Sequence, residues 1–375
     1  MPGPLWFELT GVEDIPSPAL LVYSARVDEN LRRMVTMAGG VERLRPHVKT
    51  HKVPQVVRRQ IAQGVTRFKC ATVAEAEMTA AAGAADVLLA YQPVGPAIPR
   101  LAALARAFPH TAFSAVVDDL GAATAIGDVF AREPEPLALL VDLDVGMHRT
   151  GVAPGPHAAR LYAELASRAG VRPGGLHAYD GHIRDADADV RRANCDAAFA
   201  PVSELAARLR ADGLPVPRIV AGGTPTFPMH ARRPQVECSP GTSVYWDAGY
   251  GSTLEGLDFL PAALVLTRVV SKPGGDRVCL DLGHKAIASE NPHPRVVLYT
   301  PRTATPLAAR FVGHSEEHLV LETSDAGALS IGDALYGVPW HVCPTVALHS
   351  EAVVVEDGRA VERWPIDARR RRLSI

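Results

Sequence analysis

The segment 45–52, with the sequence RPHVKTHK, carries the strongest chemical signal in this chain. Only five of the 39 lysine and arginine residues are lysines, so each lysine needs a local explanation. Lys49 ends an alternating apolar run, residues 44–49, that predicts a short buried strand. Removal from water at the end of such a strand lowers the pKa of a lysine amine and makes it a nucleophile. Lys49 could then form a Schiff base with an aldehyde cofactor, and the alternative is a surface lysine in a turn.

The turn Gly222-Gly223-Thr224 is a second candidate site, because it follows a predicted strand, residues 218–221. Two glycines allow backbone N–H groups to approach an anion closely, and a threonine hydroxyl can add a hydrogen bond. The turn therefore suits a cofactor phosphate. An ordinary two-glycine turn is the alternative.

His341 and Cys343 form a third candidate site near the C-terminus. Residues two apart in an extended chain face the same side, so these two side chains could bind one metal ion. An imidazole and a thiolate suit Zn²⁺ better than Mg²⁺. Two protein ligands would leave coordination positions open for water or substrate, as in catalytic metal sites. A structural histidine beside a buried cysteine is the alternative.

The elements that must position these groups alternate between short β-type runs and alanine-rich helical stretches. One helical stretch has explicit boundaries, since Thr72 and Glu75 fit a capping box and Gly83 is a natural stop. Eight strand–helix repeats predict a parallel (β/α)8 barrel, with an open doubly wound sheet as the alternative. The predicted strands are 20–23, 44–49, 68–71, 87–90, 112–117, 137–143, 175–178 and 218–221.

The sequence pattern changes after about residue 240. The helical periodicity ends there, and Gly and Pro residues separate short runs of β-branched residues. This pattern predicts an antiparallel β domain of about 130 residues. We therefore expect three parts: an N-terminal segment, 1–18, that packs on the β domain, a barrel, 19–240, and the β domain, 241–375. The predicted β-domain strands are 263–270, 277–282, 295–299, 318–322, 333–338 and 352–356.

Catalytic groups of a (β/α)8 barrel gather at the C-terminal ends of the strands and in the loops that follow them. Several unusual polar residues of this chain follow predicted strands. They include Lys49, Gln92, the segment 142–151, the segment 177–184 and the Gly222-Gly223-Thr224 turn. We expect these residues to lie on one rim of the barrel.

Composition limits the partners and the compartment. The 375 residues are 47% hydrophobic and 21% charged, with a net charge of −2, which gives no reason to expect a nucleic acid or membrane partner. The five scattered cysteines do not form a disulfide framework and suit a reducing compartment. The sequence has no signal-peptide pattern and no run of about 18 apolar residues, so we expect a cytoplasmic protein.

These motifs, taken in order, resemble a known family. The segment 45–52 is similar to the cofactor-lysine signature of the D-threonine aldolase and D-serine dehydratase family, whose members are pyridoxal-phosphate enzymes with an alanine-racemase-like barrel and a β domain. The resemblance implies bound pyridoxal phosphate, a divalent metal ion at His341 and Cys343, and a homodimer. It continues through the segments 70–77, 144–151, 222–224, 239–250 and 341–345.

The resemblance also implies residue roles. Lys49 would hold the cofactor as a Schiff base and act as a base at Cα of the substrate, and His182 would take the proton of the β-hydroxyl. The metal at His341 and Cys343 is expected to be Zn²⁺, with Mn²⁺ or Mg²⁺ as alternatives. Cofactor-binding residues would be His47, Gln92, Arg149, Tyr179, Gly222, Gly223 and Thr224. One departure is Ser243, which stands where many members carry a tyrosine, so the partner of the cofactor ring nitrogen stays open.

These roles predict a lyase for D-β-hydroxy-α-amino acids. We expect a D-threonine aldolase, which cleaves a carbon–carbon bond to give glycine and an aldehyde, because His182 resembles the base of the aldolase branch. A D-serine dehydratase, which releases a 2-oxo acid and ammonia, is the main alternative, because Cys343 resembles the metal ligand of that branch. An amino-acid racemase and a non-catalytic pyridoxal-phosphate carrier are further alternatives.

Overall fold

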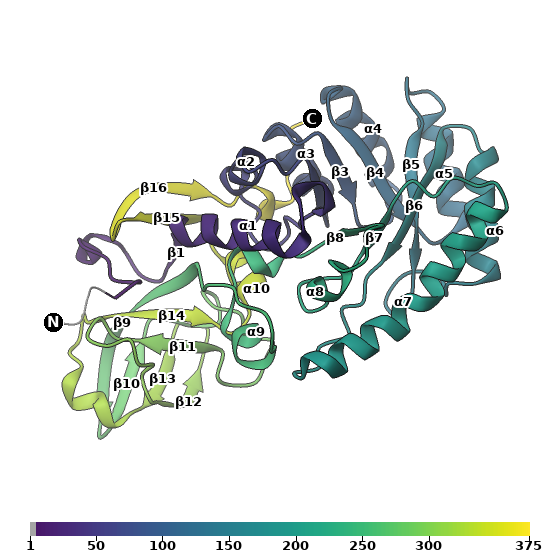
Figure 1. Ribbon diagram of the computed structural model, residues 1–375. Helices are drawn as coiled ribbons and strands as arrows, with labels where there is room; N and C mark the ends of the chain where they lie inside the picture. Colours follow the sequence, from purple (N-terminus) through teal and green to yellow (C-terminus); the bar gives the residue numbers. More distant parts are fainter. Residues whose placement is uncertain (1–4) are drawn as a thin grey trace. The chain divides into compact units, whose positions relative to one another are not determined.

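The computed structural model describes residues 5–375, which divide into two compact units (Figure 1). The barrel unit contains Arg32–Gly241, Leu254–Leu257 and Arg370–Ile375. The β unit contains residues 5–31 together with Thr242–Thr253 and Asp258–Arg369. Residues 1–4 of the predicted N-terminal segment, 1–18, lie outside the described residues. None of the helices in residues 5–375 is both long and apolar enough to cross a lipid bilayer.

A seven-stranded parallel sheet forms the core of the barrel unit, and its strands pair in sequence order. The strands are β2 (Arg67–Cys70), β3 (Asp86–Leu89), β4 (Ala112–Val117), β5 (Leu137–Leu143), β6 (Val171–Ala178), β7 (Ile219–Ala221) and β8 (Val236–Cys238). Helices follow the strands and flank the sheet (Figure 1). They are α2 (Pro54–Ala62), α3 (Val73–Ala81), α4 (Ala97–Ala107), α5 (Leu120–Phe130), α6 (Pro156–Ser167), α7 (Ala188–Ala211) and α8 (Phe227–His230). Helix α1 (Ser24–Ala38) precedes them.

The segment 44–48 closes this sheet into a ring. Leu44 forms a parallel bridge with Cys238 of β8, and His47 forms a parallel bridge with Lys69 of β2. Backbone hydrogen bonds continue both pairings, from Arg45 N–H to the Cys238 carbonyl (2.8 Å) and from Lys69 N–H to the Pro46 carbonyl (2.9 Å). The predicted eight-membered parallel barrel is therefore confirmed, with segment 44–48 as its first member.

The predicted membership of the barrel was wrong at two places. Residues 20–23 do form a strand, β1 (Ala19–Tyr23), but it pairs with β9 and β15 of the other sheet rather than with the barrel. The sequence prediction missed β8, whose three residues are too few for a periodic pattern. A buried apolar strand looks the same in either sheet, so the sequence pattern could not tell which sheet β1 would join.

The β unit is built on a nine-stranded mixed sheet whose pairs are antiparallel except for β1 with β15. Besides β1, its strands are β9 (Ala263–Gly274), β10 (Arg277–Leu280), β11 (Val296–Tyr299), β12 (Arg310–His314), β13 (Leu319–Glu322), β14 (Ala334–Pro339), β15 (Glu351–Glu356) and β16 (Arg359–Pro365). Two short helices, α9 (Ala248–Thr253) and α10 (Val342–Leu348), complete it. Phe7, Leu9 and Ile15 of the N-terminal segment share one apolar cluster with β1, β9, β14 and β15.

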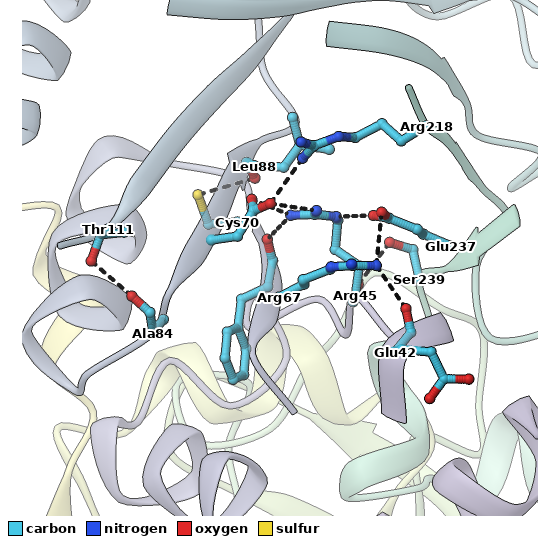
Figure 2. Close-up of polar contacts among 12 residues, drawn as sticks. Glu42, Arg45, Arg67, Cys70, Ala84, Leu88, Thr111, Arg218, Glu237 and Ser239 are labelled. Atoms are coloured by element: carbon cyan, nitrogen blue, oxygen red, sulfur yellow. Dashed lines mark hydrogen bonds and ion pairs between the residues drawn. The ribbon is translucent and has the colours of Figure 1, made fainter. Parts of the chain in front are cut away.

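Arg45 organises an ion-pair network inside the barrel (Figure 2). Its fully buried guanidinium forms a bidentate pair with Asp86 (2.7 and 3.0 Å) and donates from Nε to Glu237 (2.6 Å). Arg67 donates to Oε1 of Glu237 (3.1 Å), and Arg218 donates to Oδ2 of Asp86 (2.9 Å), which also accepts from Arg45. The network ties segment 44–48 to β2, β3 and β8. Pairing with Arg45 lowers the pKa of Asp86, although burial acts to raise it.

We predict that Arg45→Met lowers the free energy of unfolding by about 3 kcal/mol, because it leaves buried carboxylates without their main partner. Urea unfolding followed by circular dichroism measures the effect. Arg106→Met is the matched control, since Arg106 is exposed and pairs with Glu133, and it should change stability by no more than about 0.5 kcal/mol. Equal effects of the two substitutions would contradict the role of the Arg45 network.

Candidate active site

Lys49 lies directly after the barrel-closing segment 44–48, on a loop that is fixed by hydrogen bonds. The Lys49 N–H donates to Nδ1 of His47 (3.2 Å), and the Lys52 N–H donates to the Val48 carbonyl (2.9 Å). The ammonium of Lys52 forms an ion pair with the buried carboxylate of Glu75, in the first turn of α3. These contacts fix the Lys49 backbone, so the side chain that carries the amine is attached to a rigid part of the chain.

Three cationic groups surround the ring of Tyr179, which follows β6. The distances from the ring centroid are 5.5 Å to Nζ of Lys49, 5.8 Å to Nζ of Lys69 and 4.9 Å to Cζ of Arg149. All three distances lie within the range of cation–π attraction. The structure therefore brings together Lys49, Arg149 and Tyr179, as the sequence predicted for a rim of the barrel. It adds Lys69, which the sequence prediction did not assign to the site.

Lys69 is a buried lysine on β2, with only 2% of its surface exposed. Burial and the neighbouring Lys49 ammonium lower the pKa of Lys69 to about 7, although Asp142 acts to raise it. The amine can therefore change its charge near neutral pH. The scarcity of lysines was the signal that could have identified Lys69 from the sequence.

Asp142 and His177 form a buried pair at the ends of β5 and β6. Nδ1 of His177 lies 2.7 Å from Oδ1 of Asp142, and the Thr150 hydroxyl donates to Oδ2 of Asp142 (3.0 Å). Burial acts to raise the pKa of Asp142, but His177 and Thr150 lower it overall. Burial lowers the pKa of His177, although Asp142 opposes the shift. The pair therefore carries one negative charge in a pocket that holds several cations.

The Gly222-Gly223-Thr224 turn packs against Tyr179, and the geometry excludes side chains at both glycines. Gly222 has φ +78°, and a Cβ there would lie 2.5 Å from Cδ2 of His230. A Cβ on Gly223 would lie 3.0 Å from Cε2 of Tyr179, so the ring lies directly on the turn. The turn follows β7, the seventh member of the ring, and not an eighth strand as predicted. The loop after the seventh strand is still a common phosphate site in such barrels.

Hydrogen bonds hold this turn in its conformation. The Gly222 N–H donates to the Ala178 carbonyl (3.0 Å), and the Gly223 N–H donates to the Thr226 hydroxyl (3.3 Å). The hydroxyl of Thr224 accepts from the N–H of Gly241 (3.1 Å). The two glycine N–H groups thus donate to partners within the chain. They are not free to donate to a phosphate in this conformation of the turn.

Asp180, Cys195 and His230 form a buried cluster that the sequence prediction missed and that could be taken for a metal site. Nε2 of His230 lies 2.8 Å from Oδ2 of Asp180, and Nδ1 of His230 lies 3.0 Å from Nη1 of Arg233. Arginine can only donate, so Nδ1 of His230 must accept and Nε2 must carry the proton. Nε2 then has no lone pair for a metal ion, so we interpret the cluster as a support for the turn. Thr226 completes this support by donating to Oδ1 of Asp180 (2.8 Å).

His182 and Gln92 also lie in the barrel unit. Nε2 of the exposed His182 imidazole would lie 2.9 Å from a Cβ on Gly146, so the imidazole lies against the loop that follows β5. The side-chain oxygen of Gln92 accepts from the N–H of Asp118 (2.8 Å). Gln92 thus supports the loop after β4, and no described contact joins it to Lys49 or Tyr179.

His341 and Cys343 lie in the β unit, but not on one extended strand as predicted. His341 caps helix α10, and Cys343 lies in its first turn. Burial acts to lower the pKa of His341, but Cys343 and Glu290 raise it to about 9. Nδ1 of His341 lies 2.5 Å from Oε1 of Glu290, and the sulfur of Cys343 lies 3.5 Å from the Thr242 hydroxyl. The turn between strand β14 and α10 therefore brings the two side chains together without an extended chain.

Two known domain families match most of this chain. Residues 22–248 match the alanine racemase N-terminal domain, and residues 262–355 match a domain family named after serine dehydratase. The two matches follow each other along the chain, as the barrel and the strands of the β unit do.

Individual relatives match along nearly the full length. A D-threonine aldolase from Arthrobacter sp is 32% identical over 95% of this chain and 93% of its own. The crystal structure of D-threonine aldolase from Filomicrobium marinum is similar with a TM-score of 0.85 and 29% identity, and covers 98% of this chain and 99% of its own. D-threo-3-hydroxyaspartate dehydratase from Delftia sp. HT23 has a TM-score of 0.83 and 25% identity, with coverage of 94% and 98%. Relatives of both reaction types thus share this fold.

We predict that Gly222→Ala destabilises the protein more than Gly213→Ala does. The two glycines have nearly the same φ, +78° and +79°, but a Cβ on Gly213 meets no atom within 4 Å. The backbone cost of about 1 kcal/mol is therefore common to both. The clash with His230 should add about 1–3 kcal/mol for Gly222→Ala alone. Urea unfolding of both variants measures the difference, and equal losses would show that the turn has room to adjust.

Proposed function

Because the chain belongs to the alanine-racemase-like family of pyridoxal-phosphate enzymes that includes D-threonine aldolase, we propose that it cleaves D-threonine to glycine and acetaldehyde. The observation that carries the proposal is the placement of Lys49 beside the Tyr179 ring, which lies on the Gly222-Gly223 turn. The 32% identity to a D-threonine aldolase over 95% of the chain supports the choice of substrate. The relatives named above are lyases that act on D-hydroxy amino acids, and the proposal assigns this chain to the same class.

The residues of the barrel unit fit the proposed cofactor. The turn Gly222-Gly223-Thr224 follows the seventh member of the ring, where such barrels commonly bind phosphate, so we propose it as the phosphate site. Lys49, Lys69 and Arg149 supply positive charge for an anionic cofactor. His47 lies next to Lys49, and burial and the Lys49 ammonium hold its pKa well below the ordinary value, so it can accept a hydrogen bond at neutral pH. When bound, pyridoxal phosphate supplies an electron sink for charge that develops at Cα of the substrate.

The residues that move protons differ between the two lyase reactions. In the aldolase reaction, we propose that His182 takes the proton of the substrate β-hydroxyl and the Cα–Cβ bond breaks. Its exposed imidazole can exchange that proton with water. In the dehydratase reaction, Lys49 would instead take the Cα proton, and the hydroxyl would leave as water. The product therefore depends on which of these two groups receives the first proton.

We propose that His341 and Cys343 hold a divalent metal ion in the β unit. The donor set fits such an ion, because the imidazole and the sulfur are already in contact and Glu290 can orient the imidazole. A nitrogen and a sulfur donor favour Zn²⁺ over Mn²⁺ or Mg²⁺. When bound, the metal supplies a Lewis acid for the substrate hydroxyl.

The dehydratase remains the second candidate, and the sulfur ligand Cys343 is the feature that favours it. The structural similarity to D-threo-3-hydroxyaspartate dehydratase from Delftia sp. HT23 agrees with it. The resemblance stated above also leads us to propose a homodimer.

We predict that the purified protein, with pyridoxal phosphate and Zn²⁺ added, releases glycine and acetaldehyde from D-threonine faster than 2-oxobutanoate and ammonia. Lys49→Ala should lower turnover by more than about a thousandfold and abolish Schiff-base absorbance, because it removes the reacting amine. Lys285→Ala is the control, since Lys285 is an exposed lysine paired with Glu316 and Glu317 of the β unit. Faster release of ammonia than of glycine would select the dehydratase instead.

We predict that His341→Ala lowers bound zinc from about one ion per chain to near zero, whereas Cys195→Ser leaves it unchanged. The first substitution removes a proposed ligand. The second alters the cluster whose histidine carries its proton on the nitrogen that a metal would need. Metal analysis after dialysis measures both contents. Loss of zinc in Cys195→Ser alone would move the metal site to the Asp180 cluster.

A further inference from the structure

Lys69 lies next to Lys49 on the inner face of the barrel. His47 and Lys69 face each other across the pair of segment 44–48 and β2, because they form a parallel bridge. Lys49 lies in the turn that follows His47, and its N–H donates to Nδ1 of His47 (3.2 Å). Both amines lie within 6 Å of the same Tyr179 ring centroid.

The surroundings of Lys69 contain more positive than negative charge. The nearby carboxylates are Asp142, which already binds His177 and Thr150, and Asp180, which already binds His230 and Thr226. Several titratable and charged groups either act electrostatically on Lys69 or lie with it around the Tyr179 ring. They are Arg45, His47, Lys49, Asp142, Arg149, His177, Tyr179 and Asp180. A positive charge on Lys69 is therefore only partly compensated and acts on its neighbours.

We propose that Lys69 is a positioning residue whose positive charge makes the Lys49 nitrogen, once in its Schiff base, lose its proton at lower pH. The inference rests on the proposed function, because it requires a Schiff base at Lys49. Its physical basis is the repulsion between two positive charges in a site from which most water is excluded. The lowered pKa of Lys69 agrees with this repulsion, since Lys49 is one of its causes.

The sign of the effect depends on the charge at position 69. A neutral side chain removes the repulsion, so the Schiff base should keep its proton to higher pH. An arginine stays charged at every pH used and should make the Schiff base lose its proton at lower pH than in the parent protein. Lysine lies between the two, because its own proton leaves near neutral pH. A side chain with a purely structural role would not produce opposite shifts for methionine and arginine.

The experiment is an absorbance titration from pH 5 to 10 of protein loaded with pyridoxal phosphate, without substrate. We expect the midpoint of the Schiff-base transition to be highest in Lys69→Met, intermediate in the parent protein and lowest in Lys69→Arg. The shift for Lys69→Met should be about one pH unit. Lys285→Met is the control and should leave the midpoint unchanged, because the ammonium of Lys285 is exposed and paired with Glu316 and Glu317.

The outcomes separate this inference from the proposed function. If the parent protein forms no Schiff base, or keeps it in Lys49→Ala, the proposed function fails. If the Schiff base forms at Lys49 but its midpoint stays constant, or moves in the same direction in both Lys69 variants, the role of Lys69 is overturned. If Lys69→Met does not fold, the comparison of Lys69→Arg with the parent protein decides alone, and an unchanged or higher midpoint refutes the inference.

Discussion

The buried guanidinium of Arg45 is the contact on which the barrel unit depends. Segment 44–48 joins β8 and β2 through two isolated bridges and a few backbone hydrogen bonds. Burying a charge is costly unless it is paired and hydrogen-bonded, and Arg45 meets this condition through Asp86, Glu237 and the Phe68 carbonyl. Because Lys49 follows only four residues later, the same network that closes the ring also fixes the point from which the reactive amine starts.

The barrel interior holds two sets of charged side chains at opposite ends. One set stabilises the fold, and the other lies in the candidate active site. Leu88, Val116, Leu140 and Val220 form an apolar cluster inside the ring. Along β3, Asp86 comes two residues before Leu88, and along β5, Asp142 comes two residues after Leu140, so each pair shares a face of its strand. All strands are parallel, so Asp86 lies toward one end of the barrel and Asp142 toward the other. The Arg45 network therefore stabilises the N-terminal end, and the lysines, Asp142 and His177 lie near the C-terminal end, where barrel enzymes carry their active sites.

The sequence predicted most of the architecture, because parallel barrel strands are continuous apolar runs separated by helices with clear caps. Helix α3 forms as expected, with the Thr72 hydroxyl accepting from the Glu75 N–H and Gly83 at φ +100° just beyond its end. The sheet that each strand joins depends on long-range pairing, which local patterns do not contain. For this reason the sequence pattern assigned β1 to the barrel. It missed β8 because that strand has only three residues.

The proximity of Lys49, Arg149 and the Gly222-Gly223 turn to Tyr179 was predictable, because there a motif and a strand end coincide. The cluster of His230, Asp180 and Cys195 was not, because its members come from α8, the loop after β6 and α7. Lys69 was a different case: the scarcity of lysines marked it, but only the register of β2 against segment 44–48 shows that it pairs with His47 and so lies near Lys49.

Two histidines, His177 within β6 and His182 in the loop after it, are suited to opposite tasks, and this difference bears on how the chain handles protons. His177 is buried, and one of its ring nitrogens is held by Asp142, so it is oriented and cannot readily exchange protons with water. His182 is exposed and rests on Gly146, whose lack of a side chain leaves room for the imidazole. Only His182 of the two is exposed and can exchange a proton with water directly. The proposed aldol cleavage would need a proton acceptor besides Lys49, and the exposed imidazole of His182 is the one of the two that could serve it.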